Sequence, residues 1–246
     1  MLSLKKSDIE TISNILLELY AVSDIRQLEE SFLADIRALI PYNQSSFQTI
    51  KACDDNVAIE DATFVDVDEH MLPLFNDIKT EKDYLKNFFH YSKPIVYLDS
   101  DILEGDIREK NEFYRKFLKP QGLKYSCGII LIKAKKVLGI ITFFRSEEWG
   151  NFTEREIFIL DIMKDHLSNM AEACMLKKAD QMISENQNIT PREKEIIDLI
   201  IKGYTNEEIA KELYISVSTT KKHVYNIFKK YNVKNRIAFI KALGLK

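Results

Sequence analysis

The chain has 246 residues, of which 46% are hydrophobic and 30% charged, as is typical of a globular protein with two domains. Because no apolar run is long enough to span a bilayer and the N-terminus lacks a leader segment, the sequence predicts a cytoplasmic protein with no membrane partner. The net charge of −3 is unevenly divided: residues from Asn188 onward carry twelve Lys and Arg against six Asp and Glu, and the preceding residues carry −9, which predicts a polyanion partner for the C-terminal part.

Hydrophobic periodicity and turn residues divide the first 178 residues into helices and strands. The expected elements are helices to about Tyr20 and over 24–40, a β-hairpin of 45–51 and 57–67, helical pieces over 68–91, an extended segment at 94–98, an acidic loop at 99–106 and a helix over 108–118. Two apolar runs, 125–133 and 137–145, are joined by 134–136 and are predicted to be paired central strands, that is a second hairpin, covered on both faces.

A capping box, Thr153-x-x-Glu156, predicts a long helix that ends near Lys178 and is followed by a linker over 179–187. Its apolar residues recur at spacings of three and four, and they include more positions than one sheet face requires. We hypothesise that the stripe forms a dimer interface, with intramolecular packing as the equal alternative; it consists of Leu160, Met163, Leu167, Met170 and Cys174.

The chain shows no pattern typical of a catalytic or metal site. Cys53, Cys127 and Cys174 are widely spaced and are interpreted as buried free thiols, and the isolated histidines match no ligand spacing. We therefore expect no enzyme activity, no metal and no cofactor.

Four residues that favour helix N-termini divide the C-terminal part, 188–246, into four short helices. Thr190-Pro191-Arg192-Glu193 and Thr205-Asn206-Glu207-Glu208 are capping boxes, Ser216 caps the third helix and Asn235 the fourth. Within the third helix the apolar side is Val217, Thr220, Val224, Ile227 and Tyr231, and the opposite side is Ser218, Lys221, Lys222, Tyr225 and Lys229. Two short helices with a tight turn, the second presenting hydroxyl and amine groups, suit insertion into the DNA major groove.

This C-terminal pattern resembles the LuxR/NarL/GerE-type helix-turn-helix regulators from Ile189 to Leu243. The matching residues are Thr190-Pro191-Arg192-Glu193-x-Glu195, Gly203-x-x-Asn206-x-Glu208-Ile209-Ala210, Leu213-x-Ile215-Ser216, Thr219-x-Lys221-x-His223-Val224-x-Asn226-Ile227 and Val233-x-Asn235-Arg236. The chain departs from the family at Thr220, where valine is usual, and at Tyr231-Asn232, where leucine and glycine are usual.

The resemblance implies a bacterial transcription regulator that binds double-stranded DNA as a homodimer on an inverted repeat, with the fourth helix at the dimer contact. We expect Lys221, Lys222 and Tyr225 to reach base edges. The residues expected to hold phosphates are Thr205, Asn206, Ser216, Ser218, Lys229, Lys234 and Arg236. RNA polymerase is a further possible partner.

The preceding region, from about 106 to 170, resembles GAF-like sensory domains. The resemblance rests on Phe113-Tyr114, Phe117-Leu118-Lys119-Pro120-x-Gly122, Gly139 to Arg145, Phe152-Thr153-x-x-Glu156 and Asp165-His166-Leu167. It implies an α+β domain, 1–178, in which helices flank an antiparallel sheet, joined to the all-α domain, 188–246. Two interpretations stay open for it: a sensor that a small-molecule effector modulates, with ligand residues unknown, and a ligand-free dimerisation or protein-interaction module.

Overall fold

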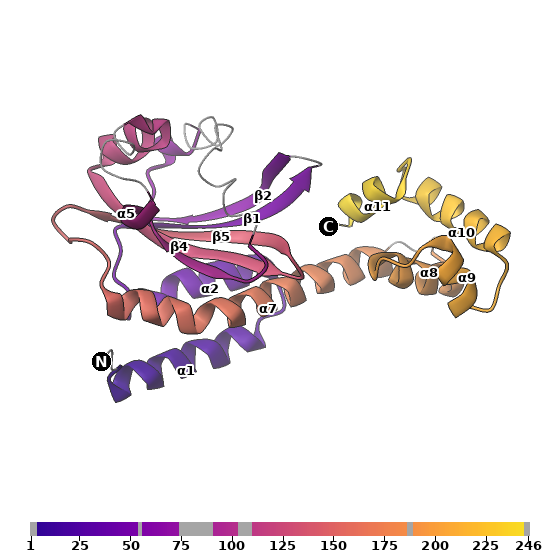
Figure 1. The fold of residues 1–246 in the computed structure, drawn as a ribbon, viewed down its shortest axis with the longest axis horizontal. Helices are drawn as coiled ribbons and strands as arrows, with labels where there is room; N and C mark the ends of the chain where they lie inside the picture. Colours follow the sequence, from indigo (N-terminus) through magenta and orange to yellow (C-terminus); the bar gives the residue numbers. More distant parts are fainter. Residues whose placement is uncertain (1–3, 54–55, 74–90, 103–109, 186–188, 244–246) are drawn as a thin grey trace. The chain divides into compact units, whose positions relative to one another are not determined.

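The computed structural model describes residues 4–53, 56–73, 91–102, 110–185 and 189–243 (Figure 1). The chain divides into two compact units, Met1–Ala173 and Cys174–Lys246, and each is considered by itself. The predicted class, an α+β unit with an antiparallel sheet followed by an all-α unit, is confirmed.

The first unit begins with two helices and continues as a sheet interrupted by short helical turns. Its elements are α1 (Lys6–Ala21), α2 (Ile25–Ile36), β1 (Gln44–Cys53), β2 (Asn56–Val65), η1 (Glu69–Met71), β3 (Ile95–Leu98), α5 (Asp99–Ile102), η3 (Tyr114–Leu118), η4 (Lys119–Gln121), β4 (Leu123–Lys133), β5 (Lys136–Ser146) and α7 (Glu154–Glu185). The second unit contains the end of α7, then α8 (Pro191–Ile201), α9 (Asn206–Glu212), α10 (Val217–Lys230) and α11 (Arg236–Ala242).

The strands of the described residues form one antiparallel sheet in the order β2-β1-β5-β4-β3. Both predicted hairpins, β1–β2 and β4–β5, are therefore confirmed, and β4 and β5 are interior strands as expected. The β4–β5 turn places Ala134 and Lys135 at φ of 49° and 64°, the left-handed conformation that a two-residue hairpin turn requires.

Two helical turns differ from the predicted elements. Residues 99–102, expected in a loop, form the single helical turn α5, and 114–118, expected in an α-helix, form a π-helical turn. The predicted helical pieces over 68–91 lie mostly outside the described residues.

Helices α1, α2 and the first part of α7 lie on one face of the sheet (Figure 1). Phe32 of α2 and Phe143 of β5 place their ring centroids 6.3 Å apart, and both side chains are fully buried. All five side chains of the predicted α7 stripe, from Leu160 to Cys174, are also buried within the single chain. These residues therefore pack intramolecularly, and they are not available as the dimer contact that the sequence suggested.

Helix α1 lies parallel to α7, and side-chain interactions connect the two helices at two positions. Arg155 donates to both oxygens of Asp8, at 3.1 and 2.8 Å, and Tyr20 Oη lies 2.8 Å from Nδ1 of His166. The apolar side chains that α1 buries are Ile12, Ile15 and Leu19, and Asp8 is buried as well.

A buried ion pair joins β5 to the start of α7. Arg145 Nη1 and Nη2 donate to the two carboxylate oxygens of Glu156, and Arg145 Nε donates to Pro41 O at 2.6 Å. Glu156 also accepts from Thr153 N at 2.8 Å, which confirms the predicted capping box. Burial disfavours the charged carboxylate, but the hydrogen bonds from Arg145 and Thr153 outweigh it and lower the pKa of Glu156.

The other face of the sheet carries a row of hydroxyl groups between two apolar clusters. Cross-strand pairing aligns Ser46 on β1, Thr142 on β5, Gly128 on β4 and Tyr97 on β3. Tyr97 Oη reaches across Gly128 to Thr142 Oγ1 at 2.7 Å, which is possible because Gly128 has no side chain. All of these side chains are buried.

Helix α7 is longer than the sequence predicted. The helix was expected to end near Lys178 and a linker to occupy 179–187, but α7 continues to Glu185. Ala179 and Ile183 lie one turn apart and are buried in the core of the second unit together with residues of α8, α9, α10 and α11. Their apolar contacts stabilise this last part of the helix.

The predicted burial of the thiols is confirmed for Cys127 and Cys174, and Cys127 is a free thiol, as expected. The side chain of Cys53 lies outside the described residues. Burial raises the pKa of Cys127 well above its ordinary value, which keeps the thiol protonated.

The buried carboxyl of Glu29 on α2 predicts a pH-dependent stability. Only 1% of Glu29 is exposed, Oε2 receives the hydroxyl of Thr63 at 2.6 Å, and Oε1 has no hydrogen-bond partner among the described residues. Burial raises the pKa of Glu29 to about 7 from 4.5. The folded state therefore binds a proton that the unfolded chain releases between these pH values, so stability falls as the pH rises from 4.5 to 7.

Glu29→Gln is neutral at every pH, so we expect it to remove this dependence. The difference in free energy of unfolding, variant minus wild type, should be up to about 3 kcal/mol larger at pH 8 than at pH 4.5. Urea unfolding at several pH values measures it. Glu30→Gln, an exposed neighbour on the same helix, is the control. A parallel pH dependence of the wild type and Glu29→Gln would contradict the prediction.

Candidate nucleic-acid interface

The four helices of the second unit begin at the residues that the sequence predicts. Thr190, Thr205, Ser216 and Asn235 each accept a hydrogen bond from a backbone N–H in the first turn of the following helix. Thr190 and Thr205 also close capping boxes with Glu193 and Glu208. The local sequence therefore determines where each helix starts.

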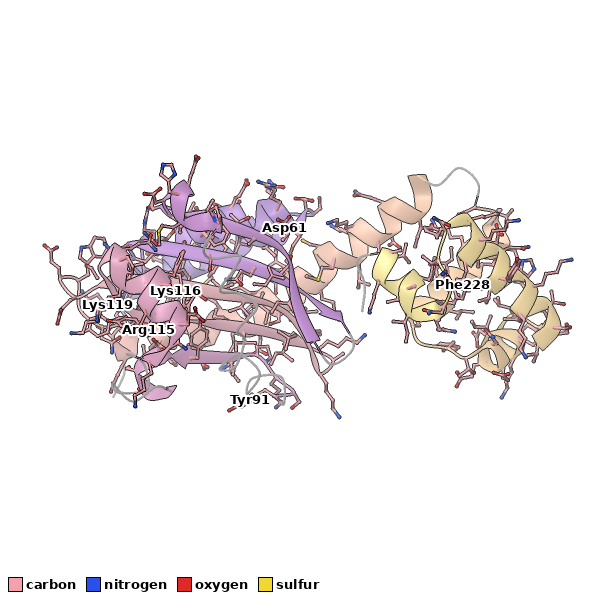
Figure 2. All side chains as sticks on the ribbon, turned by 90° about the horizontal axis from the view of Figure 1, so that it is seen from above. Asp61, Tyr91, Arg115, Lys116, Lys119 and Phe228 are labelled. Carbon is pink, nitrogen blue, oxygen red and sulfur yellow. The ribbon has the colours of Figure 1, made fainter. Side chains whose placement is uncertain are left out.

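An apolar core holds the helices of this unit together. Ile196, Ile200, Ile209, Ile227 and Phe239 are fully buried in it. Phe228 of α10, labelled in Figure 2, places its ring 5.5 Å from that of Phe239 on α11.

The residues that depart from the resembled family fit this core. Thr220 is fully buried, and its hydroxyl donates to Ser216 O at 3.2 Å within the helix. Tyr231 packs edge-on against Phe239 with centroids 5.0 Å apart. Asn232 has φ of 52°, a left-handed conformation that glycine adopts freely and asparagine tolerates.

The predicted division of α10 into two faces is confirmed by burial. Thr220, Val224 and Ile227 are buried, and Val217 and Tyr231 are partly buried. The predicted outward residues are all exposed: Ser218, Lys221, Lys222, Tyr225 and Lys229. Lys221, Lys222 and Lys229 pair with no carboxylate of the described residues, so this face of α10 presents uncompensated positive charge.

The hydroxyl groups at the start of α10 form a connected cluster. Ser216 Oγ accepts from Thr219 N at 3.0 Å and lies 2.8 Å from Ser218 Oγ. Both serines are exposed. Because the cap uses only part of the bonding capacity of Ser216, the cluster retains groups that can meet an anion.

Other predicted phosphate contacts already have partners in the chain. Thr205 N donates to Glu208 Oε2 at 2.7 Å, so a carboxylate occupies the start of α9, and Asn206 is partly buried there. Arg236 Nη2 donates to the carbonyls of Ile200 and Tyr204, which ties α11 to the end of α8. Lys234 is exposed. Among the described residues, no partner of the Lys234 amine is found, so this group can meet a ligand.

Two features of this unit were missed by sequence reasoning. Lys230 was counted with the basic residues, but it forms an ion pair with Glu193, whose side chain is 5% exposed. Tyr214, in the turn between α9 and α10, is the second feature because its side chain is almost fully exposed. Helical periodicity separates the directions of Lys229 and Lys230, but it does not identify the partner of Lys230.

The described residues contain no group of three or more His, Cys, Asp or Glu side chains that could hold a metal ion. Within that same part of the chain, none of the helices combines the length and apolar character needed to cross a bilayer.

Comparison with known families identifies residues 187–243 as matching the bacterial regulatory proteins of the luxR family. The CsgBAC operon transcriptional regulatory protein of Escherichia coli strain K12 is 51% identical over 53 residues, which are 22% of this chain and 24% of that relative. The chain thus spans about a quarter of the length of this curated relative. The C-terminal segment is accordingly a luxR-family helix-turn-helix domain.

Two solved proteins share the fold over longer stretches. Escherichia coli SdiA has a TM-score of 0.59 at 18% identity and covers 96% of this chain and 98% of its own; SdiA in complex with octanoyl-rac-glycerol has a TM-score of 0.61, also at 18% identity, and covers 98% and 97%. The LBD domain of VqsR from Pseudomonas aeruginosa has a TM-score of 0.51 at 11% identity and covers 70% of this chain and 99% of its own. At these identities the similarity establishes the fold.

The adjacent lysines of α10 are predicted to differ in their effect on stability. Lys230→Ala removes the ion-pair partner of the buried Glu193 and should lower the free energy of unfolding by about 1–2 kcal/mol. Lys229→Ala alters an exposed side chain and should change it by less than about 0.5 kcal/mol. Urea unfolding of the two variants compares them directly, and equal losses would show that the Lys230 pair contributes nothing.

Proposed function

We propose that this chain is a bacterial transcriptional regulator that acts in the cytoplasm and binds specific sequences of double-stranded DNA through α10. The luxR-family match of residues 187–243 supports the proposal. The observation that carries it is the exposed face of α10. On this face, three lysines that pair with no carboxylate of the described residues lie beside a tyrosine that is 67% exposed. The major groove of B-DNA, about 12 Å wide, accepts one helix with such a face.

Within this proposal, Lys221, Lys222 and Tyr225 read the bases. They lie on the exposed face within the first nine residues of α10, and the N-terminal part of a recognition helix contacts base edges. Lysine amines donate to guanine O6 and N7.

Phosphates are assigned to the residues around this base-reading group. Ser216 and Ser218 lie at the start of α10, Lys229 at its end and Lys234 before α11. Thr205 and Asn206 remain proposed contacts at α9. Because two carbonyls engage Nη2 of Arg236, only its other N–H groups can serve a phosphate.

The proposed regulator is a homodimer that meets its second copy at α11. Ile237, the second residue of this helix, is 59% exposed, although it is a large apolar residue. A second copy would cover it, in agreement with the dimer contact that the luxR-type resemblance implies.

The double variant Lys221→Ala/Lys222→Ala tests the recognition face. We expect it to lose specific binding to a duplex selected from random DNA, since both amines that reach the bases are removed. Fluorescence anisotropy at fixed salt measures the affinity. Lys135→Ala/Lys136→Ala, which removes two adjacent exposed lysines from the β4–β5 turn, is the charge-matched control. Unchanged affinity of the recognition-face variant would refute the assignment.

For the first unit we propose the sensing of a small neutral molecule at the hydroxyl row of the sheet. Ser46, Tyr97 and Thr142 provide neutral donors and acceptors, and Phe117 and Phe144 belong to the adjoining apolar cluster. Buried polar groups on an otherwise apolar sheet face are typical of a ligand site. SdiA, whose fold is shared, has been solved with octanoyl-rac-glycerol, a neutral molecule with a polar head and an apolar chain.

A ligand-free dimerisation or protein-interaction module is the second candidate for this unit. It is favoured by the hydrogen bonds that the hydroxyl row already has within the chain. Tyr97 bonds to Thr142, and Gln48 Nε2 donates to Ser46 Oγ, so these polar groups need no ligand as a hydrogen-bond partner.

Thermal unfolding with octanoyl-rac-glycerol as the probe separates the two candidates. A sensor should show a rise in melting temperature that grows with probe concentration, and Thr142→Val should reduce the rise because it removes one hydroxyl of the row. Thr49→Val, at a buried threonine on the opposite sheet face, is the control and should retain the full rise. The ligand-free candidate predicts no rise for the wild type with this probe.

A further inference from the structure

The turn between α9 and α10 holds an unusual tyrosine. Tyr214 has φ of 53°, in the left-handed region that disfavours residues other than glycine, asparagine and aspartate. Its side chain is 95% exposed, the largest fraction among the exposed large hydrophobic residues of the described chain. The backbone is therefore strained at a position where the ring contributes no packing.

The conformation of this turn is imposed by its neighbours. Ile215 N donates to Ala210 O at 3.0 Å, Tyr214 N donates to Lys211 O at 3.4 Å, and Arg192 Nη2 donates to Leu213 O at 2.8 Å. None of these bonds involves the phenol ring. Glycine or asparagine would satisfy the same bonds with less strain, so the fold does not explain the presence of tyrosine.

Tyr214 lies close in sequence to the face of α10 that is proposed to bind DNA. It precedes the N-cap Ser216 by two residues, at the end of α10 where the Ser216–Ser218 hydroxyl cluster lies. Lys211, one turn earlier on α9, is exposed as well. The phenol is thus an exposed donor at the border of the base-reading face, where the DNA backbone passes when a helix lies in the major groove.

We propose that Tyr214 is a DNA-contacting residue that donates its hydroxyl hydrogen to a backbone phosphate. This inference rests on the proposed DNA binding through α10. A phosphate contact fixes the position of the protein on the duplex without reading sequence, so Tyr214 contributes equally on all sequences.

Tyr214→Asn tests this role because asparagine tolerates the left-handed backbone. Its melting temperature should equal or exceed that of the wild type, whereas its affinity should fall about tenfold on both a selected and an unrelated duplex, as expected for one lost hydrogen bond to a charged group. Tyr214→Phe, which keeps the ring, should lose a similar factor. Asn232→Gly, at an exposed left-handed residue after α10, is the matched control and should bind like the wild type.

Wild-type affinity in Tyr214→Asn or in Tyr214→Phe would overturn the phosphate contact. Lys221→Ala/Lys222→Ala in the same titrations separates this failure from failure of the proposed function. If the wild type binds and the double-lysine variant does not, DNA binding through α10 holds and only the Tyr214 inference falls; if the wild type binds no duplex, both fall.

Discussion

Each unit of this protein depends on a glutamate that performs two tasks at the start of a helix. Glu156 of α7 and Glu193 of α8 close the capping boxes of their helices. Each also forms an ion pair with a basic side chain from a distant element: Glu156 with Arg145 on β5, and Glu193 with Lys230 on α10. A buried carboxylate without such partners would be strongly destabilising. The pairing therefore connects the direction of a helix to the element against which it packs.

In the second unit this constraint determines which residues of α10 meet solvent. The pair between Glu193 and Lys230 fastens the last turn of α10 to the first turn of α8, and Thr220, Val224 and Ile227 fill the core along the same side. The opposite side is consequently left to lysine, serine and tyrosine. The proposed recognition face thus follows from how α10 is anchored.

The two faces of the sheet in the first unit have different chemistry. On the face covered by α2, large apolar side chains such as Phe32 and Phe143 fill the contact. On the other face, Ser46, Thr142 and Tyr97 are buried in a row across four strands, where apolar residues would stabilise the fold more. This difference is the structural reason for seeking an effector site on the hydroxyl row.

The sequence by itself determined the features that depend on near neighbours: the caps at Thr190, Thr205, Ser216 and Asn235, both hairpins and the two faces of α10. Capping and periodicity act over a few residues, so they can be read along the chain. Tertiary structure alone decided the extension of α7 through Ile183, the burial of its apolar stripe, the pairing of Lys230 with Glu193 and the hydroxyl row from Ser46 to Tyr97. Each of these depends on partners distant in sequence, which local patterns do not specify.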